Sequence, residues 1–162
     1  LEYAYKDDNL HGVSVDYDST GKKDSERKFK NGLKHGDWNY YNDDIELVHV
    51  EVYEDDLKNG LWYTKDLDTR DIHYEEYRDD KFIVRYTEHY YPNYQLKEKY
   101  AYKDSLPHGK WIGYYKDGET KHVKRFEDGK KQGKWQFFTE GGDVHTFELY
   151  ENDKRNSEWY KT

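Results

Sequence analysis

The sequence contains no cysteine and no methionine, only two prolines, and no long apolar run. The absence of cysteine excludes disulfides, thiolate metal sites and thiol nucleophiles together. Because no apolar run approaches the roughly 18 residues that span a bilayer, no transmembrane segment is expected. Hydrophobic residues make up 33% of the 162 residues, and 19 Tyr, 6 Phe and 5 Trp supply more than half of them. Any core must therefore be built largely from aromatic rings.

Charge is abundant and unevenly distributed along the chain. Charged residues make up 38% and the mean hydropathy is -1.43, which approaches the disordered range, but disordered segments are poor in aromatics. Residues 1–80 hold 22 acidic and 11 basic side chains, whereas 81–162 hold 13 acidic and 16 basic ones, for a net charge of -8. We expect a folded array with a thin core and an acidic N-terminal half.

An internal period of about 24 residues organises the whole chain. Each Trp lies nine residues after an aromatic residue, and two further aromatic residues complete a series of seven anchors. The anchors are Tyr5, Phe29, Tyr53, Tyr77, Tyr102, Phe126 and Tyr150, and the tryptophans are Trp38, Trp62, Trp111, Trp135 and Trp159. This spacing predicts seven copies of one structural unit.

Turn residues recur in the same phase. Two residues after each anchor stands Asp or Asn, as in Asn31-Gly32 and Asp128-Gly129, and such pairs favour tight hairpin turns with positive φ. Sixteen residues after the anchor, Gly21, Gly118 and Gly142 mark a second turn. A further glycine comes seven residues after the anchor in five copies, at Gly12, Gly36, Gly60, Gly109 and Gly133.

These signals predict an all-β protein in which residues 1–162 form a single array. Two strands per repeat give a single elongated, twisted antiparallel β-meander, with Trp as the core residue and the glycine two residues earlier leaving room for its ring. Repeat four departs from the pattern, because Val84 replaces the glycine, Tyr86 replaces Trp and one extra residue is present. A change of curvature is expected there.

The repeat resembles the MORN family. The residues Phe126, Asp128, Gly129, Gln132 and Gly133 are similar to its core of aromatic, x, Asn or Asp, Gly, x, x, His, Gly. Trp where the usual unit has Gly looks like the bacterial variant of the repeat. Proteins similar to that variant are commonly labelled antitoxin components of toxin–antitoxin pairs, so the resemblance implies an all-β fold and a protein-binding role.

Catalytic and metal-binding alternatives have little support in the sequence. His49, His73 and His122 recur in phase, but neighbouring repeats are about 10 Å apart, too far to share a metal ion. Paired carboxylates such as Asp7-Asp8 fall in the predicted turns, and the segment 16–21 lacks ligands of a calcium loop. No phosphate loop or nucleophile motif is present, so neither an enzyme nor a cofactor or metal site is predicted.

Nucleic acid is not expected as a partner, because residues 101–134 hold 9 basic against 5 acidic side chains, a small excess. The leading hypothesis is a non-catalytic protein-binding scaffold, in its most specific form an antitoxin or immunity protein that covers a basic partner. The residues predicted to bind are acidic: Asp43, Asp44, Glu46, Glu51, Glu54, Asp55, Asp56, Glu75, Asp79 and Asp80.

The alternative is a structural or spacer component of a cell-envelope or surface assembly. Because residue 1 is Leu rather than Met, the sequence assigns no compartment, and both a cytoplasmic and an exported location stay open. The sequence also assigns neither the identity of the partner nor the oligomeric state.

Overall fold

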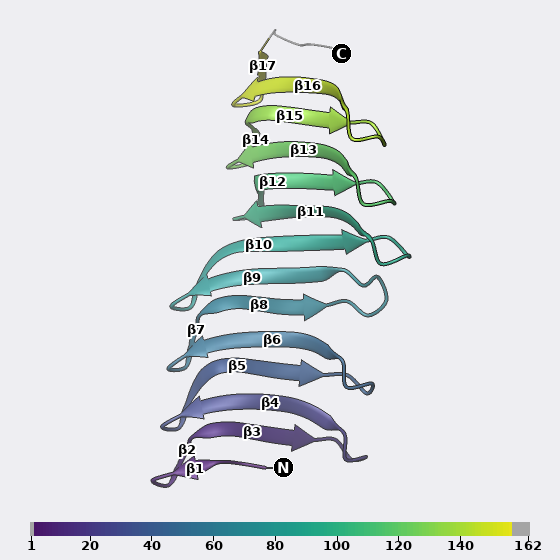
Figure 1. Ribbon diagram of the computed structural model, residues 1–162. Helices are drawn as coiled ribbons and strands as arrows, with labels where there is room; N and C mark the ends of the chain where they lie inside the picture. The colour runs from purple at the N-terminus through teal and green to yellow at the C-terminus, as the bar shows by residue number, and fades with distance from the viewer. Residues whose placement is uncertain (1, 157–162) are drawn as a thin grey trace. The chain divides into compact units, whose positions relative to one another are not determined.

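The computed structural model describes residues 2–156, which form strands joined by short connections, with no helix among them (Figure 1). The strands are β1 (Tyr5–Lys6), β2 (Asn9–Leu10), β3 (Gly12–Tyr17), β4 (Lys23–Lys30), β5 (Leu33–Tyr41), β6 (Leu47–Glu54), β7 (Leu57–Lys58), β8 (Gly60–Lys65), β9 (Ile72–Arg78), β10 (Lys81–Tyr90), β11 (Leu96–Lys103), β12 (Leu106–Tyr114), β13 (Thr120–Glu127), β14 (Lys130–Lys131), β15 (Gly133–Phe138), β16 (Val144–Glu151) and β17 (Lys154–Asn156).

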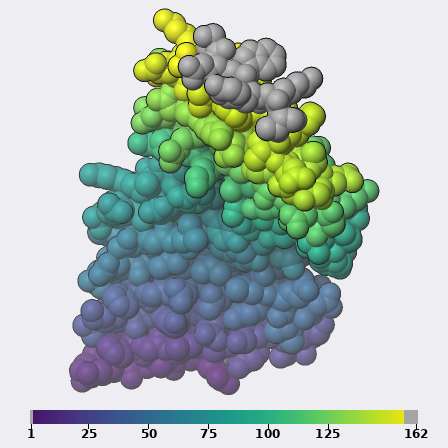
Figure 2. All heavy atoms as spheres, turned by 45° about the horizontal axis from the view of Figure 1, so that its top comes forward, coloured from purple at the N-terminus to yellow at the C-terminus, as the bar shows by residue number. Residues whose placement is uncertain are grey.

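The chain divides into two compact units. The N-terminal unit comprises Leu1–Leu67 and His73–Ile83, and the C-terminal unit comprises Asp68–Ile72 and Val84–Thr162. The strand order is β3-β4-β5-β6-β8-β9 in the first and β10-β11-β12-β13-β15-β16-β17 in the second, so neighbours in sequence are neighbours in the sheet. The side chains of successive repeats in the N-terminal unit lie in contiguous bands, purple to blue in Figure 2.

The predicted fold class is confirmed as an all-β, open antiparallel meander. Each recorded strand pairing is antiparallel, as between β5 and β6 or β12 and β13. Within residues 2–156, no helix is long and apolar enough to cross a membrane.

The first turn of each repeat is the predicted tight hairpin. Both central residues have positive φ in all seven repeats, the conformation that matches the twist of the flanking strands. These pairs are Asp7-Asp8, Asn31-Gly32, Asp55-Asp56, Asp79-Asp80, Asp104-Ser105, Asp128-Gly129 and Asn152-Asp153.

The second turn is a longer loop with one left-handed residue. In repeat five the Tyr115 amide donates to the Glu119 carbonyl at 2.8 Å, and Gly118 donates back to Tyr115 at 3.0 Å. Gly118 has φ +95°, whereas the same hydrogen-bond pattern in repeat two places Ile45 at φ +60°. A β-branched residue such as Ile45 is strained in that conformation. The Ile45 side chain is also 51% exposed.

The glycine seven residues after the anchor produces a β-bulge. Gly36 has φ +73°, and the register between β4 and β5 shifts beside it. The expectation that this glycine leaves room for the Trp ring is wrong. A Cβ on Gly36 or Gly60 would instead meet the side chain of Lys28 or Val52, in each case at 3.2 Å. The positive φ is what requires glycine here.

Tryptophans and anchors form a continuous ladder on one face of each unit, here termed the Trp face. In the N-terminal unit, ring centroids of Phe29, Trp38, Tyr53, Trp62 and Tyr77 follow one another at 5.1 to 5.4 Å. Trp38 and Trp62 are only 6% and 8% exposed. In the C-terminal unit, the corresponding ladder is Tyr102, Trp111, Phe126, Trp135 and Tyr150.

Each of these Trp indoles also makes the same hydrogen bond. The Nε1–H of Trp38 donates to the Lys28 carbonyl at 2.9 Å, ten residues earlier, and Trp62 donates to Val52 at 3.0 Å. Trp111 and Trp135 repeat this bond in the C-terminal unit. These four tryptophans therefore hold equivalent positions in their repeats; Trp159 lies outside the described residues.

Repeat four departs from the ladder. Val84 stands where the other repeats have the bulge glycine, and β10 has ten residues. Tyr86 then pairs with Ala101 while Thr87 pairs with Tyr100, whose ring stacks on Trp111. Side chains alternate along a strand, so Tyr86 lies on the face opposite the Trp ladder and is 40% exposed.

Candidate functional site

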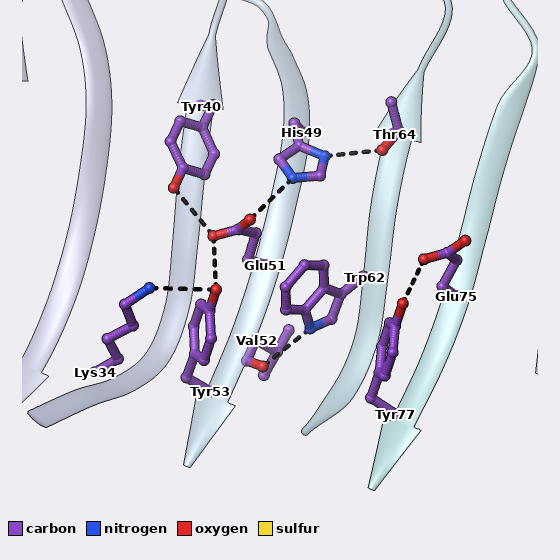
Figure 3. Close-up of polar contacts among 10 residues, drawn as sticks. All are labelled: Lys34, Tyr40, His49, Glu51, Val52, Tyr53, Trp62, Thr64, Glu75 and Tyr77. Carbon is purple, nitrogen blue, oxygen red and sulfur yellow. Dashed lines mark hydrogen bonds and ion pairs between the residues drawn. The ribbon is translucent and has the colours of Figure 1, made fainter. Parts of the chain in front are cut away.

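The Trp face of the N-terminal unit has an aromatic half and a polar half. The ladder lies toward the first turns, and a set of hydrogen-bonded polar side chains lies beside it on β5, β6, β8 and β9 (Figure 3). Alternation along β6 places His49, Glu51 and Tyr53 on this face together. The polar half brings several interacting titratable groups together and is therefore the first candidate site.

Glu51 is the centre of this polar set. Its Oε2 accepts hydrogen bonds from the hydroxyls of Tyr40 and Tyr53, both at 3.1 Å. Its Oε1 lies 3.5 Å from Nε2 of His49, whose Nδ1 is 2.8 Å from the hydroxyl of Thr64. Glu51 is half-buried, so its carboxylate is satisfied by residues of its own sheet.

Both phenols are held in the protonated state. Burial, reinforced by the neighbouring charge of Glu51, raises the pKa of Tyr40 to about 12. The same causes, in the same order, raise the pKa of Tyr53. A phenol that remains protonated at neutral pH donates a hydrogen bond and is a poor nucleophile. The arrangement is therefore suited to holding strands in register.

Lysines cover the ladder on the same face. The Nζ atom of Lys34 lies 4.4 and 4.5 Å from the ring centroids of Trp38 and Tyr53. Lys58 repeats the contact over Trp62 at 4.3 Å, and Lys131 does so in the C-terminal unit over Trp135. These cations shield the rings from water by cation–π contact and are engaged within the fold.

A second polar chain occurs in the C-terminal unit, at repeat four. Nδ1 of His89 lies 2.5 Å from a carboxylate oxygen of Asp71, and Nε2 lies 2.5 Å from the hydroxyl of Tyr100. Carboxylate, imidazole and hydroxyl in this order can activate a nucleophile. Burial, however, raises the pKa of Tyr100, and its ring packs on Trp111 at 5.1 Å. The chain therefore fastens the segment Asp68–Ile72 to β10 and β11.

The three phased histidines lie in different surroundings. His49 belongs to the Glu51 set, and His73 lies on β9. His122 packs beside Gly113, where an added Cβ would come within 2.4 Å of its ring. Burial, followed by the nearby charge of Lys124, lowers the pKa of His122. Within residues 2–156, no group of three or more His, Cys, Asp or Glu side chains could hold a metal ion.

The carboxylates of the segment 16–21 are engaged by protein groups. Asp16 pairs with Arg27 and accepts a hydrogen bond from Ser25. Asp18 accepts the amides of Thr20 and Lys22 at 2.7 and 3.0 Å. The Thr20 hydroxyl, as the largest cause, lowers the pKa of Asp18. These contacts belong to a turn rather than to a cation site.

The ten acidic residues predicted to bind a partner fall into three separate groups. Glu51 and Glu75 are half-buried on the Trp face, where Glu75 accepts the Tyr77 hydroxyl at 2.7 Å. The others are exposed and lie at opposite ends of the strands. Asp43, Asp44 and Glu46 form the second-turn group, and Glu54, Asp55, Asp56, Asp79 and Asp80 form the first-turn group. The eight residues of β6 separate these two groups by roughly 26 Å, so they do not make one patch.

Two of the first-turn carboxylates connect adjacent repeats. Oδ1 of Asp56 accepts the backbone amide of Lys34 at 2.7 Å, and Oδ1 of Asp80 accepts that of Lys58 at 2.7 Å. The backbone amides of both Asp residues donate to the carbonyls of the same lysines at 3.0 Å. The sequence correctly predicted a turn role for such aspartates, but the side-chain acceptor acts across the repeat boundary.

Lys34, Lys58 and the Asp71–His89–Tyr100 chain were not predicted from the sequence. A lysine five residues after the anchor in repeats two, three and six was a visible signal. Asp71 and His89 gave none, because they belong to the irregular repeat and have no phased counterparts.

The comparisons with known proteins give no name to this geometry. No protein-family model matches the chain, and a search of curated proteins finds no significant match. The sheet itself shows a repeat β protein of many hairpins.

Proposed function

We propose that the chain is a non-catalytic protein-binding scaffold of MORN-like type, an antitoxin or immunity protein that covers a basic partner with the acidic hairpin ends of its N-terminal unit. The exposed first-turn and second-turn carboxylates carry this proposal. The first-turn carboxylates project from consecutive repeats at a spacing of two strands, about 10 Å, and the second-turn carboxylates lie together in the β5–β6 connection, so a partner surface can meet several carboxylates of either group at once.

The distribution of cations in the same unit supports an acidic surface. The N-terminal unit holds 20 acidic and 11 basic side chains. Many of the basic groups are already engaged: Lys34 and Lys58 cover rings, and Arg27 pairs with Asp16. Lys65 lies 3.4 Å from Glu46, an exposed pair that neutralises little. Fast, salt-sensitive association with a basic protein is the behaviour such a surface favours.

Two matched triple variants test the proposal. The first-turn variant combines Glu54→Gln, Asp55→Asn and Asp79→Asn, and the second-turn variant combines Asp43→Asn, Asp44→Asn and Glu46→Gln. Each removes three exposed charges, and both keep Asp56 and Asp80, whose carboxylates connect repeats. Each variant is therefore the charge control for the other.

The wild-type chain and both variants are immobilised and used to capture proteins from a lysate of the source organism. We expect a basic protein to be retained by the wild type and by one variant, and lost from the other. Retention of the same partner by both variants would contradict the electrostatic proposal. That outcome would favour the spacer alternative, which needs no acidic edge.

A further inference from the structure

The sheet face opposite the Trp ladder in the C-terminal unit carries a row of three cations. Lys110 on β12 pairs directly with Arg125 on β13, whereas Trp111 pairs with Lys124 on the other face. Val123 on β13 pairs with Gln136 on β15, so alternation places Arg125 and Lys134 on one face, where the Nζ of Lys134 stands 4.3 Å from the ring centroid of Phe147. We call Lys110, Arg125 and Lys134 the cationic row.

The carboxylates of this region are confined to the ends of the hairpins. Strands β12 and β15 contain no Asp or Glu, and β13 contains only its last residue, Glu127. The other acidic residues of 101–134 lie in turns: Asp104, Asp117, Glu119 and Asp128. The small basic excess counted along the sequence therefore becomes a strong local excess on the body of this face.

The cationic row is not neutralised by the fold. All three side chains are exposed, and none takes part in an ion pair recorded among residues 2–156. Like charges directly opposite one another on neighbouring strands destabilise a sheet. Strands about 4.8 Å apart hold these three charges within a span of about 10 Å. An anion bound across the row would relieve this repulsion.

A concave surface adjoins the row. A cavity of about 420 Å³ is lined by His108, Gly109, Arg125, Phe126, Glu127 and Gln132. Nδ1 of His108 is buried without a hydrogen-bond partner, and its nearest recorded acidic atom is Oδ1 of Asp128 at 3.8 Å. Arg125 therefore belongs to the cationic row and also lines this cavity, together with His108 and its unpaired Nδ1.

Aromatic rings lie on the same face as the row. Tyr86, 40% exposed, projects from β10, and Phe147 lies beneath Lys134, whose ammonium covers part of its ring. Cations that track a backbone, combined with rings on which bases stack, are the two features of surfaces that bind single-stranded nucleic acid.

We propose that this face of the C-terminal unit binds single-stranded nucleic acid, with the cationic row contacting backbone phosphates and the flanking rings contacting bases. This inference is independent of the partner proposed for the N-terminal unit, since it uses none of that unit's carboxylates. The sequence predicted no nucleic-acid partner, because charges counted along the chain do not distinguish the two faces of a sheet.

The test is fluorescence anisotropy of a labelled single strand of about 15 nucleotides, as DNA and as RNA, titrated with the full chain. The test variant is Lys110→Gln/Arg125→Gln/Lys134→Gln. The control is Lys6→Gln/Lys30→Gln/Lys81→Gln, which removes three exposed cations from the N-terminal unit. Circular dichroism confirms that both variants keep the β spectrum.

Three phosphate contacts on a single strand predict a slope of about -2 for log K against log salt, or about 20-fold weaker binding between about 50 and 200 mM salt. We expect the control to keep this slope and the test variant to lose most of it. Absence of binding at low salt, or equal weakening in test and control variants, would overturn the proposal. Equal displacement of the strand by a polyglutamate peptide of matched charge would also overturn it, and would identify an acidic polypeptide as the partner.

Discussion

Substitutions at the ninth position after the anchor should have opposite consequences in repeats six and four. Trp135 and Tyr86 occupy this position in their repeats, and the periodicity treats them as equivalent. In the structure Trp135 is 6% exposed between Phe126 and Tyr150, whereas Tyr86 is 40% exposed on the opposite face. Trp135→Ala and Tyr86→Ala therefore form a matched pair.

The magnitude follows from what each ring contacts. A buried indole removes about 200 Å² from water, worth about 5 kcal/mol as an upper bound at 25 cal/mol per Å². Its Nε1–H bond to the Arg125 carbonyl contributes about 1 kcal/mol more. Allowing for relaxation, Trp135→Ala should cost about 3–5 kcal/mol of unfolding free energy. Tyr86→Ala should cost less than about 1 kcal/mol.

The assay is urea unfolding followed by far-UV circular dichroism, with the slope on denaturant compared between variants. Trp135→Phe keeps a ring in the ladder and loses the indole hydrogen bond, so its cost should lie between the two alanine variants. Equal costs for Trp135→Ala and Tyr86→Ala would refute the change of face that the structure assigns to repeat four.

Three further predictions concern turns and the Glu51 set. Asp80→Ala should lower the free energy of unfolding by about 1 kcal/mol more than Asp79→Ala, because only Asp80→Ala removes the acceptor of the Lys58 amide. Faster hydrogen exchange at the Lys58 amide in Asp80→Ala would confirm this prediction, and equal destabilisation by the two substitutions would contradict it. Gly118→Ala should destabilise by about 1 kcal/mol in urea unfolding, since φ is +95° there, and a neutral result would exclude a strained turn. The pKa of Tyr40 is raised to about 12 from about 10 in the unfolded chain, so its contribution to stability is complete below pH 10 and is lost as pH rises from 10 to 12. Tyr40→Phe should therefore reduce the loss of stability between pH 10 and 12 in alkaline unfolding. An unchanged unfolding curve would count against the pKa shift.

The regular part of the fold could be predicted because each repeat uses residues with strong local preferences. Asn31-Gly32 and Asp128-Gly129 specify tight turns without reference to the rest of the chain, and the fixed spacing of Trp from its anchor sets the strand length. The irregular repeat could not be resolved in the same way. Tyr86 pairs with Ala101 and so lies on the face opposite Trp111, which follows from strand register rather than from composition.

The candidate sites were harder to predict, because charge counts along a sequence ignore where side chains lie. Asp44 and Asp55 are close in sequence but lie at opposite ends of β6, and Glu51 between them is taken up by tyrosine hydroxyls. Trp111 and Lys110 are adjacent in sequence but lie on opposite faces. Only the pairing of strands separates these groups.

The bonds between successive repeats also bear on how the chain folds. They join residues 22 or 23 positions apart, such as Asp80 with Lys58 and Tyr115 with Phe138. Such contacts give a low contact order for an all-β protein, so the entropy of closing each loop stays small. We expect each hairpin to serve as a template for the next, and folding to propagate along the array from whichever repeat forms first.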